Sequence, residues 1–132
     1  MNDFIEIKPS PKHGKGLFAL KDFSAGEAVF VLKPGRVVNH EEIGRLSRFE
    51  KMHLDQIGNN QYEIIEPPGC YANHSCAPNL VERDRTGYAL ADIKAGEEIT
   101  IDYDQIAYLE EPFTCHCGHP NCRGLIHGKT NI

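Results

Sequence analysis

Several short stretches of the chain are rich in apolar residues, and the first and last of them alternate apolar with polar residues, which is the pattern of β-strands. These stretches are residues 4–8, 17–20, 27–32, 62–66, 80–83, 87–91 and 98–103. Most are bounded by Gly or Pro, and residues 84–86 predict the turn of a hairpin between the fifth and sixth stretches. We therefore expect a mostly β fold built from short strands.

Residues 39–57 carry the one long helical pattern. Apolar side chains recur there every three positions, at Ile43, Leu46, Phe49 and Met52. Asn39, with Glu42 three residues later, forms a variant of the capping box, and Gly58 supplies a stop. The pattern predicts a single helix that packs its apolar face on a sheet; the alternative is a helix that lines a substrate groove. The last third of the chain, rich in Cys and Gly, predicts irregular structure.

The chain of 132 residues has the length of one domain, with 40% hydrophobic and 25% charged residues. No apolar run approaches the roughly 20 residues that span a bilayer, and the N-terminus lacks the pattern of a secretory signal. We expect a cytoplasmic protein without a membrane partner. The net charge of −5 argues against direct nucleic-acid binding. It suits a basic partner such as a lysine-rich protein segment, although solubility alone also explains it.

Five cysteines are present, and Cys115, Cys117 and Cys122 fall within eight residues. In a cytosolic chain such spacing is more typical of metal ligands than of disulfides. Structural zinc takes four ligands in a tetrahedron. The spacing alone leaves the fourth open among Cys70, Cys76, His116, His119 and His127. The alternative is that these cysteines only pack.

Three further segments are candidates for binding or catalysis. Gly14-Lys15-Gly16 lets a ligand approach the backbone closely, although two glycines alone more often make a turn. Asn73-His74 follows a Pro-Pro-Gly break, and a lone histidine is most often structural. Asp102-Tyr103 ends the last predicted strand, where a tyrosine is most often part of the core.

Four segments, taken in their order, resemble a known family. They are residues 14–19 (GKGLFA), 73–79 (NHSCAPN), 96–103 (GEEITIDY) and 115–124 (CHCGHPNCRG). Together they resemble a SET domain with its zinc-binding post-SET tail. The resemblance implies a β-clip of several small sheets with one or two short helices and a pseudoknot-like C-terminal threading. It places the SET domain at residues 1–109 and the tail at 110–132, in one compact unit.

The resemblance also implies an activity, which is methyl transfer from S-adenosylmethionine to a lysine of a protein. It assigns the cofactor to Gly14, Lys15, Gly16, Asn73 and His74, with an apolar contact from Leu125. It assigns the reaction channel to Tyr103 and Tyr71. It selects Cys76 as the fourth zinc ligand beside Cys115, Cys117 and Cys122, which leaves Cys70 as a free thiol.

Methyl transfer to an amine needs a neutral lysine, and a free lysine has a pKa of about 10.4. An apolar channel lowers that pKa, and positioning supplies up to roughly 7–11 kcal/mol. Tyr103 would orient the amine rather than act as a strong base. In the family, the position of Ile101 commonly carries Phe or Tyr and limits the number of methyl groups. Isoleucine there predicts more than one methylation.

The chain departs from the family pattern in three ways. Cys70 and Tyr71 stand where an Arg-Phe pair usually precedes the Asn-His-Ser motif. The insert at residues 38–60 is short, and no cysteine-rich segment precedes the domain, so the chain resembles the minimal versions found in microbes and viruses. The alternative function is a non-catalytic, zinc-stapled module that binds a peptide or the cofactor. A hydrolytic zinc enzyme is disfavoured, because four cysteine ligands leave no open coordination position.

Overall fold

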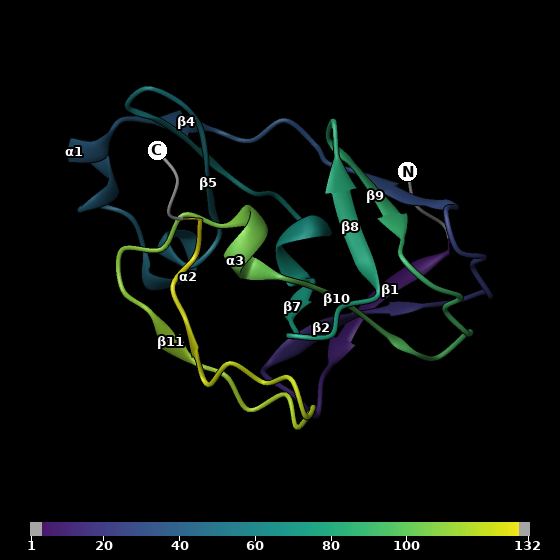
Figure 1. Cartoon of the computed structure of the whole chain (residues 1–132). Helices are drawn as coiled ribbons and strands as arrows, with labels where there is room; N and C mark the ends of the chain where they lie inside the picture. Colours follow the sequence, from purple (N-terminus) through teal and green to yellow (C-terminus); the bar gives the residue numbers. More distant parts are fainter. Residues whose placement is uncertain (1–3, 130–132) are drawn as a thin grey trace.

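Short strands form four small sheets in the computed structural model, which describes residues 4–129 (Figure 1). The largest has the order β1 (Ile5–Pro9), β2 (Lys15–Ala19), β10 (Glu98–Ile101) and β7 (Asn73–His74). The second is β3 (Ala28–Val31), β9 (Thr86–Ala89) and β8 (Leu80–Arg83). The third is β4 (Val37–Val38), β6 (Gln61–Ile64) and β5 (Leu54–Gly58), and the fourth pairs β11 (Phe113–Thr114) with β12 (Leu125–Ile126). The expected mostly β fold is confirmed.

The strands form where apolar side chains gather in short runs, and one hairpin shows the role of the turn. Strands β8 and β9 pair with Arg83 opposite Thr86, and the two residues between them, Asp84 and Arg85, have φ of 50° and 70°. Positive φ at both central residues is the geometry whose twist matches that of the flanking strands. The predicted hairpin is therefore confirmed.

The single helix expected over residues 39–57 is wrong. Two one-turn helices, α1 (His40–Ile43) and α2 (Arg48–Lys51), lie there, and the chain then enters β5. The predicted capping box of Asn39 with Glu42 is present, but Ser47 with Glu50 forms a second one that starts a new helix. From Leu54 onward, pairing with β6 replaces helical hydrogen bonds, so sheet formation overrides the three-residue apolar period.

The strand expected over residues 98–103 ends at Ile101. The side chain of Asp102 accepts a hydrogen bond from the Asp104 N–H and caps helix α3 (Tyr103–Ile106). Tyr103 therefore opens a helix, whereas the sequence led us to expect it at the end of the strand. The last third is also more regular than expected, because it contains α3, β11 and β12.

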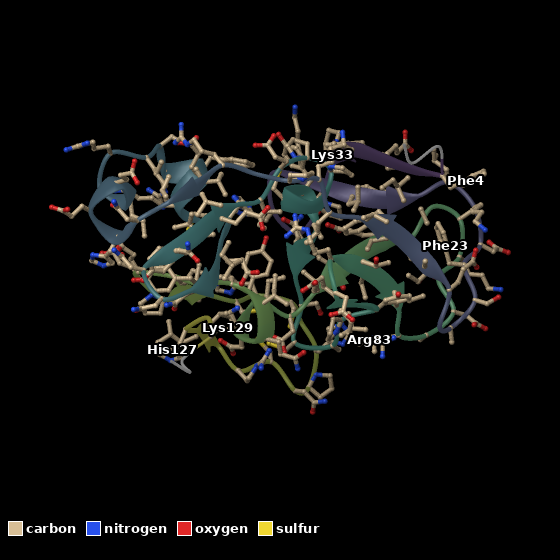
Figure 2. The ribbon with its side chains drawn as sticks, turned by 90° about the horizontal axis from the view of Figure 1, so that it is seen from above. Phe4, Phe23, Lys33, Arg83, His127 and Lys129 are labelled. Atoms are coloured by element: carbon tan, nitrogen blue, oxygen red, sulfur yellow. The ribbon has the colours of Figure 1, made fainter. Side chains whose placement is uncertain are left out.

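Two apolar clusters hold these elements together. The larger gathers side chains of the first two sheets with Tyr103, Cys115 and Ile126, so the C-terminal tail belongs to the main core. The smaller lies between α1, β5 and β6. Figure 2 shows Phe4 and Phe23 at one end of the molecule and places His127 and Lys129, on the tail, away from that end at the lower edge. No helix within residues 4–129 has the length and apolar character needed to cross a membrane.

Candidate functional site

A cavity of about 670 Å³ opens between the loop before β2, helix α2, the segment from 3-10 helix η1 (Gly69–Tyr71) to β7, and strand β11. Six of the residues assigned from the sequence to the cofactor or the reaction channel line it: Gly14, Lys15, Tyr71, Asn73, His74 and Tyr103. They come from three separate parts of the chain. Their convergence follows from the parallel pairing of β7 with β10, which lies beside β2. The volume is that of a site for a small molecule or cofactor.

The Asn73 side chain fixes the loop that forms one rim of this cavity. Its Nδ2 donates to the carbonyl oxygens of His13 and Lys15, both at 3.1 Å, and to Oε2 of Glu98 at 2.9 Å. These bonds occupy the amide nitrogen and leave the amide oxygen for a ligand. The hydroxyl of Ser10 donates to the same carboxylate at 2.9 Å, so Glu98 fixes both Ser10 and Asn73 at the loop before β2.

Two predicted cofactor residues do not line the cavity. Gly16 is buried on β2, and a Cβ there would collide with the Glu98 carboxylate that holds Asn73. Leu125 lies on β12 and is 45% exposed. Gly16 thus supports the rim indirectly, while direct cofactor contacts by Gly16 and Leu125 stay predictions.

Tyr103 is buried at the inner end of the cavity. Its hydroxyl donates to the Ala72 carbonyl oxygen at 2.9 Å, and its backbone N–H donates to Nδ1 of His74 at 3.0 Å. The His53, His74 and Phe113 rings stand edge-on to its ring at 6.3, 5.8 and 5.8 Å. Burial raises the pKa of the phenol well above its usual range, so Tyr103 stays protonated. It can orient a polar group but not act as a base.

A second, narrow cavity of about 50 Å³ adjoins the first. Its walls are mostly apolar and include Phe30, Leu54, Ile101 and Ile106. Four residues line both cavities: Met52, His53, Cys70 and Tyr103. The two spaces are therefore neighbours across one shared wall, and Tyr103 belongs to it. Burial raises the pKa of the Cys70 thiol to about 11, so this cysteine is a neutral part of the wall.

Met52 and His53 were missed from the sequence, because both fall inside the helix wrongly expected over residues 39–57. The signal that could have found them is Ser47 with Glu50 three residues on, a second capping box in the middle of that stretch. It places Met52 and His53 at the end of a short helix, directly before a strand.

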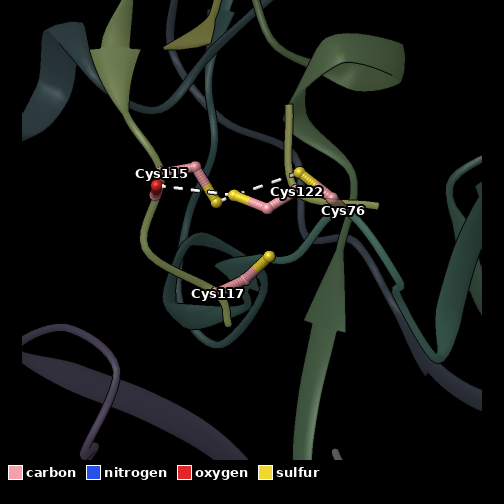
Figure 3. Close-up of side chains that lie close together, drawn as sticks. All are labelled: Cys76, Cys115, Cys117 and Cys122. Atoms are coloured by element: carbon pink, nitrogen blue, oxygen red, sulfur yellow. Dashed lines mark hydrogen bonds between the residues drawn. The ribbon is translucent and has the colours of Figure 1, made fainter. Parts of the chain in front are cut away.

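The four sulfur atoms of Cys76, Cys115, Cys117 and Cys122 lie within 4.8 Å of one another (Figure 3). Cys76 follows β7, and the other three belong to the tail, so the group joins segments 39 residues apart. The candidates Cys70, His116, His119 and His127 do not belong to this group. Four converging sulfur atoms match the tetrahedral ligand set of a structural zinc site, and the group could hold such an ion.

Donor groups around the cluster suit thiolates. The Arg123 N–H donates to Cys76 Sγ at 3.4 Å, and a backbone N–H of His119 lowers the pKa of Cys117 to about 6. Burial raises the pKa of Cys115 to about 12. A cation would compensate the burial of this thiolate, because metal-bound thiols lose their proton.

The tail that carries the cysteines also forms part of the large cavity. Phe113, Cys115 and Cys117 line it. Arg123 pairs with Asp102 at 2.8 Å and with Asp104 at 3.2 Å, immediately beside Tyr103. Closure of the tail over the body of the protein therefore completes the wall of the site.

Comparison with known proteins bears on this arrangement. The family model described as SET domain matches residues 14–104. Three fungal proteins named histone-lysine N-methyltransferase, H3 lysine-36 specific, are similar to the chain: 32% identical in Coccidioides immitis, 33% in Yarrowia lipolytica and 43% in Aspergillus oryzae. Each alignment covers 96% of this chain. The chain spans only 14%, 18% and 15% of the length of these relatives, respectively.

Proposed function

The chain belongs to the SET-domain family, and on that premise we propose that it is a protein-lysine N-methyltransferase that uses S-adenosylmethionine. The observation that carries the proposal is the shared wall between the two cavities. The large cavity has the size of a cofactor site and gathers Gly14, Lys15, Asn73 and His74. The narrow cavity has the apolar walls that the end of a lysine side chain requires, and Tyr103 lies between the two.

The residues of the large cavity fit S-adenosylmethionine. Lys12, Lys15 and Arg48 line the cavity and would supply positive charge for its carboxylate, and the amide oxygen of Asn73 would accept from its ammonium group. Tyr71 and Phe49, whose rings lie 5.6 Å apart, offer aromatic surface for its adenine. When bound, the cofactor supplies a methyl group on a sulfonium.

The residues of the narrow cavity prepare the lysine. Its apolar walls disfavour the charged ammonium, so they lower the pKa of the lysine toward the neutral form that can attack. The Tyr103 oxygen, whose proton is held by the Ala72 carbonyl, keeps its lone pairs to accept from the amine. Tyr71 lies beside α2 at the large cavity, where it would form a wall of the reaction channel.

We propose Zn²⁺ as the metal of the four-cysteine group, with a structural role. Four thiolates fill its coordination sphere, so the ion supplies no open position for a reaction. The zinc ion would hold the tail at residues 110–132 against the SET domain at residues 1–109. The tail and the SET domain would then form one unit.

The relatives' names suggest a histone tail as substrate, and we propose a basic, lysine-containing protein segment. The chain's net charge of −5 supports a basic partner. Glu82 lines the narrow cavity, where a positively charged segment would approach. A histone substrate would place the protein with chromatin, whereas the sequence led us to expect the cytoplasm.

The test is methyl transfer from labelled S-adenosylmethionine to recombinant histone H3 and to a mixture of basic proteins. We expect label on lysine in at least one protein. Cofactor binding without transfer to any protein would favour the alternative, a non-catalytic binding module. Absence of both binding and transfer in zinc-loaded protein would contradict the proposed function.

A further inference from the structure

His53 lies where the two cavities meet. It lies just after α2, its ring is tilted against that of Phe49 with the centroids 4.3 Å apart, and it stands edge-on to Tyr103 at 6.3 Å. Of the four residues that line both cavities, Met52 carries no ionisable group, while Cys70 and Tyr103 stay protonated at neutral pH. His53 is therefore the member of the shared wall that can offer a basic nitrogen.

The structure settles which nitrogen is free. Nδ1 of His53 lies 2.6 Å from the Phe49 carbonyl oxygen, which can only accept, so Nδ1 carries the proton and donates it. In the neutral ring, Nε2 then holds a lone pair. Within residues 4–129, Nε2 of His53 has no hydrogen-bond partner. In the same part of the chain, every side-chain nitrogen or oxygen atom that is fully buried does have one. Nε2 is therefore not fully buried, and His53 lines both cavities.

We propose that His53 Nε2 accepts a hydrogen bond from the neutral ε-amine of the substrate lysine and, together with Tyr103, orients its lone pair toward the large cavity. The inference rests on the proposed function and adds a catalytic residue to it. A phenol and an imidazole on the same wall are two acceptors for two amine N–H groups. Positioning of this kind is the main contribution that such a site makes to rate.

Charge around the ring keeps Nε2 available. Burial, and to a smaller extent the charge of His13, lower the pKa of His53, while its bond to Phe49 opposes them. The large cavity is lined by the cations Lys12, Lys15 and Arg48 and by the imidazoles of His13, His74 and His116, and, among the residues that the structure describes, by no carboxylate. On the narrow side, Asp55 pairs with Lys129 at 2.5 Å, which compensates its charge, while Glu82 accepts from the backbone N–H of Arg85 at 2.8 Å and keeps its negative charge.

This arrangement predicts a distinct pH profile. Protonation of Nε2 removes the acceptor and places a cation beside the lysine, so activity depends on two deprotonated groups, the lysine and His53. Near neutral pH, log(kcat/KM) for a histone H3 substrate should rise with pH with a slope of about one, from deprotonation of the lysine. Below the pKa of His53, which lies under about 6.5, the slope should increase to about two, because His53 must also lose its proton. His53→Gln keeps an acceptor oxygen without a titrating group. We expect it to lose the steep limb while retaining kcat/KM at pH 7.5 within about threefold.

The experiment compares wild type, His53→Gln, His53→Leu and the exposed control His40→Gln at saturating S-adenosylmethionine. His53→Leu, which offers no acceptor, should lose about two- to twelvefold in kcat/KM at pH 7.5, the range expected for one hydrogen bond. His40→Gln should match wild type at every pH. Circular dichroism at each pH verifies that all variants are folded. A steep acid limb that persists in His53→Gln would overturn the proposal, as would full activity of His53→Leu.

A second readout is independent of activity. Two-bond ¹H–¹⁵N spectra of histidine-labelled protein, assigned with His53→Gln, should show His53 protonated on Nδ1 at neutral pH and titrating below about 6.5. Protonation on Nε2 instead, or titration above that value, overturns the role of His53. Failure of wild type to methylate any protein, with the expected tautomer present, would instead contradict the proposed function and leave the geometry of the ring intact.

Discussion

Replacement of Tyr103 by Phe removes one buried hydrogen bond and little else. The ring contacts with His53, His74 and Phe113 remain, and the lost group is the hydroxyl that donates to Ala72 at 2.9 Å. Tyr103 is only 7% exposed, so the carbonyl loses its partner where water is scarce. We expect the free energy of unfolding to fall by about 1–3 kcal/mol. For a chain of this length the melting temperature should fall by roughly 3–15 °C.

The assay is urea unfolding, in which the midpoint should shift at unchanged slope. Tyr71→Phe is the matched control, because Tyr71 is half-buried and its hydroxyl makes no hydrogen bond within residues 4–129; its midpoint should match wild type. Tyr103→Phe should also reduce methyl transfer by at least the two- to twelvefold expected for one hydrogen bond, since one of the two acceptors for the amine is lost. Equal unfolding midpoints for Tyr103→Phe and wild type would refute the hydrogen bond to Ala72. They would also refute the claim that this bond orients the Tyr103 hydroxyl.

Four further outcomes follow from the structure. Purified protein should contain one zinc per chain and Cys76→Ser clearly less by metal analysis; a full zinc complement in Cys76→Ser would remove this cysteine from the ligand set. In Gly16→Ala the added methyl group collides with the Glu98 carboxylate that holds Asn73, so this variant should bind S-adenosylmethionine more weakly in calorimetry. Gly44→Ala, where the nearest atom to the added methyl group is 3.8 Å away, should bind with normal affinity. Equal affinities of the two variants would contradict a role of Glu98 and Asn73 in shaping the cofactor site. Arg85 lowers the pKa of Glu63, so the stability that the Glu63 carboxylate adds is complete above about pH 4.3 and is lost as pH falls through its lower folded pKa. Glu63→Gln should therefore unfold at lower urea than wild type at pH 7, with a smaller difference at pH 3; equal differences would count against the pair. Ile101→Tyr narrows the small cavity and should shift products toward monomethyl-lysine in mass spectrometry, and monomethyl product alone from wild type would refute the predicted multiple methylation.

The strands were predictable because their information is local. A period of two in the apolar pattern and a turn that accepts positive φ at Asp84 and Arg85 suffice to define the β8–β9 hairpin. Residues 39–57 were not predictable in this way. Their apolar period favours a helix, but Leu54 buries its side chain and pairs with Ile64 in the sheet, and this long-range gain decides the conformation.

The candidate site also contains residues that local sequence predicts and residues that only the fold reveals. The close spacing of three of the four cysteines predicts them as metal ligands from the sequence. The fourth ligand could have been any of five residues, and only the resemblance to SET domains selected Cys76. The structure brings Cys76 to the other three because β7 pairs with β10 and the tail crosses beside it. His53 belongs to the site only because two cavities share a wall, and that property depends on the three-dimensional arrangement of segments remote in sequence.

The most direct test of the account is a crystal structure of the zinc-loaded protein with S-adenosylhomocysteine. We predict that the molecule occupies the large cavity against Lys15 and Asn73, beside the wall that carries Tyr103, with the metal bound by the four cysteines. A molecule bound elsewhere, or an empty cavity at saturating concentration, would contradict the central claim.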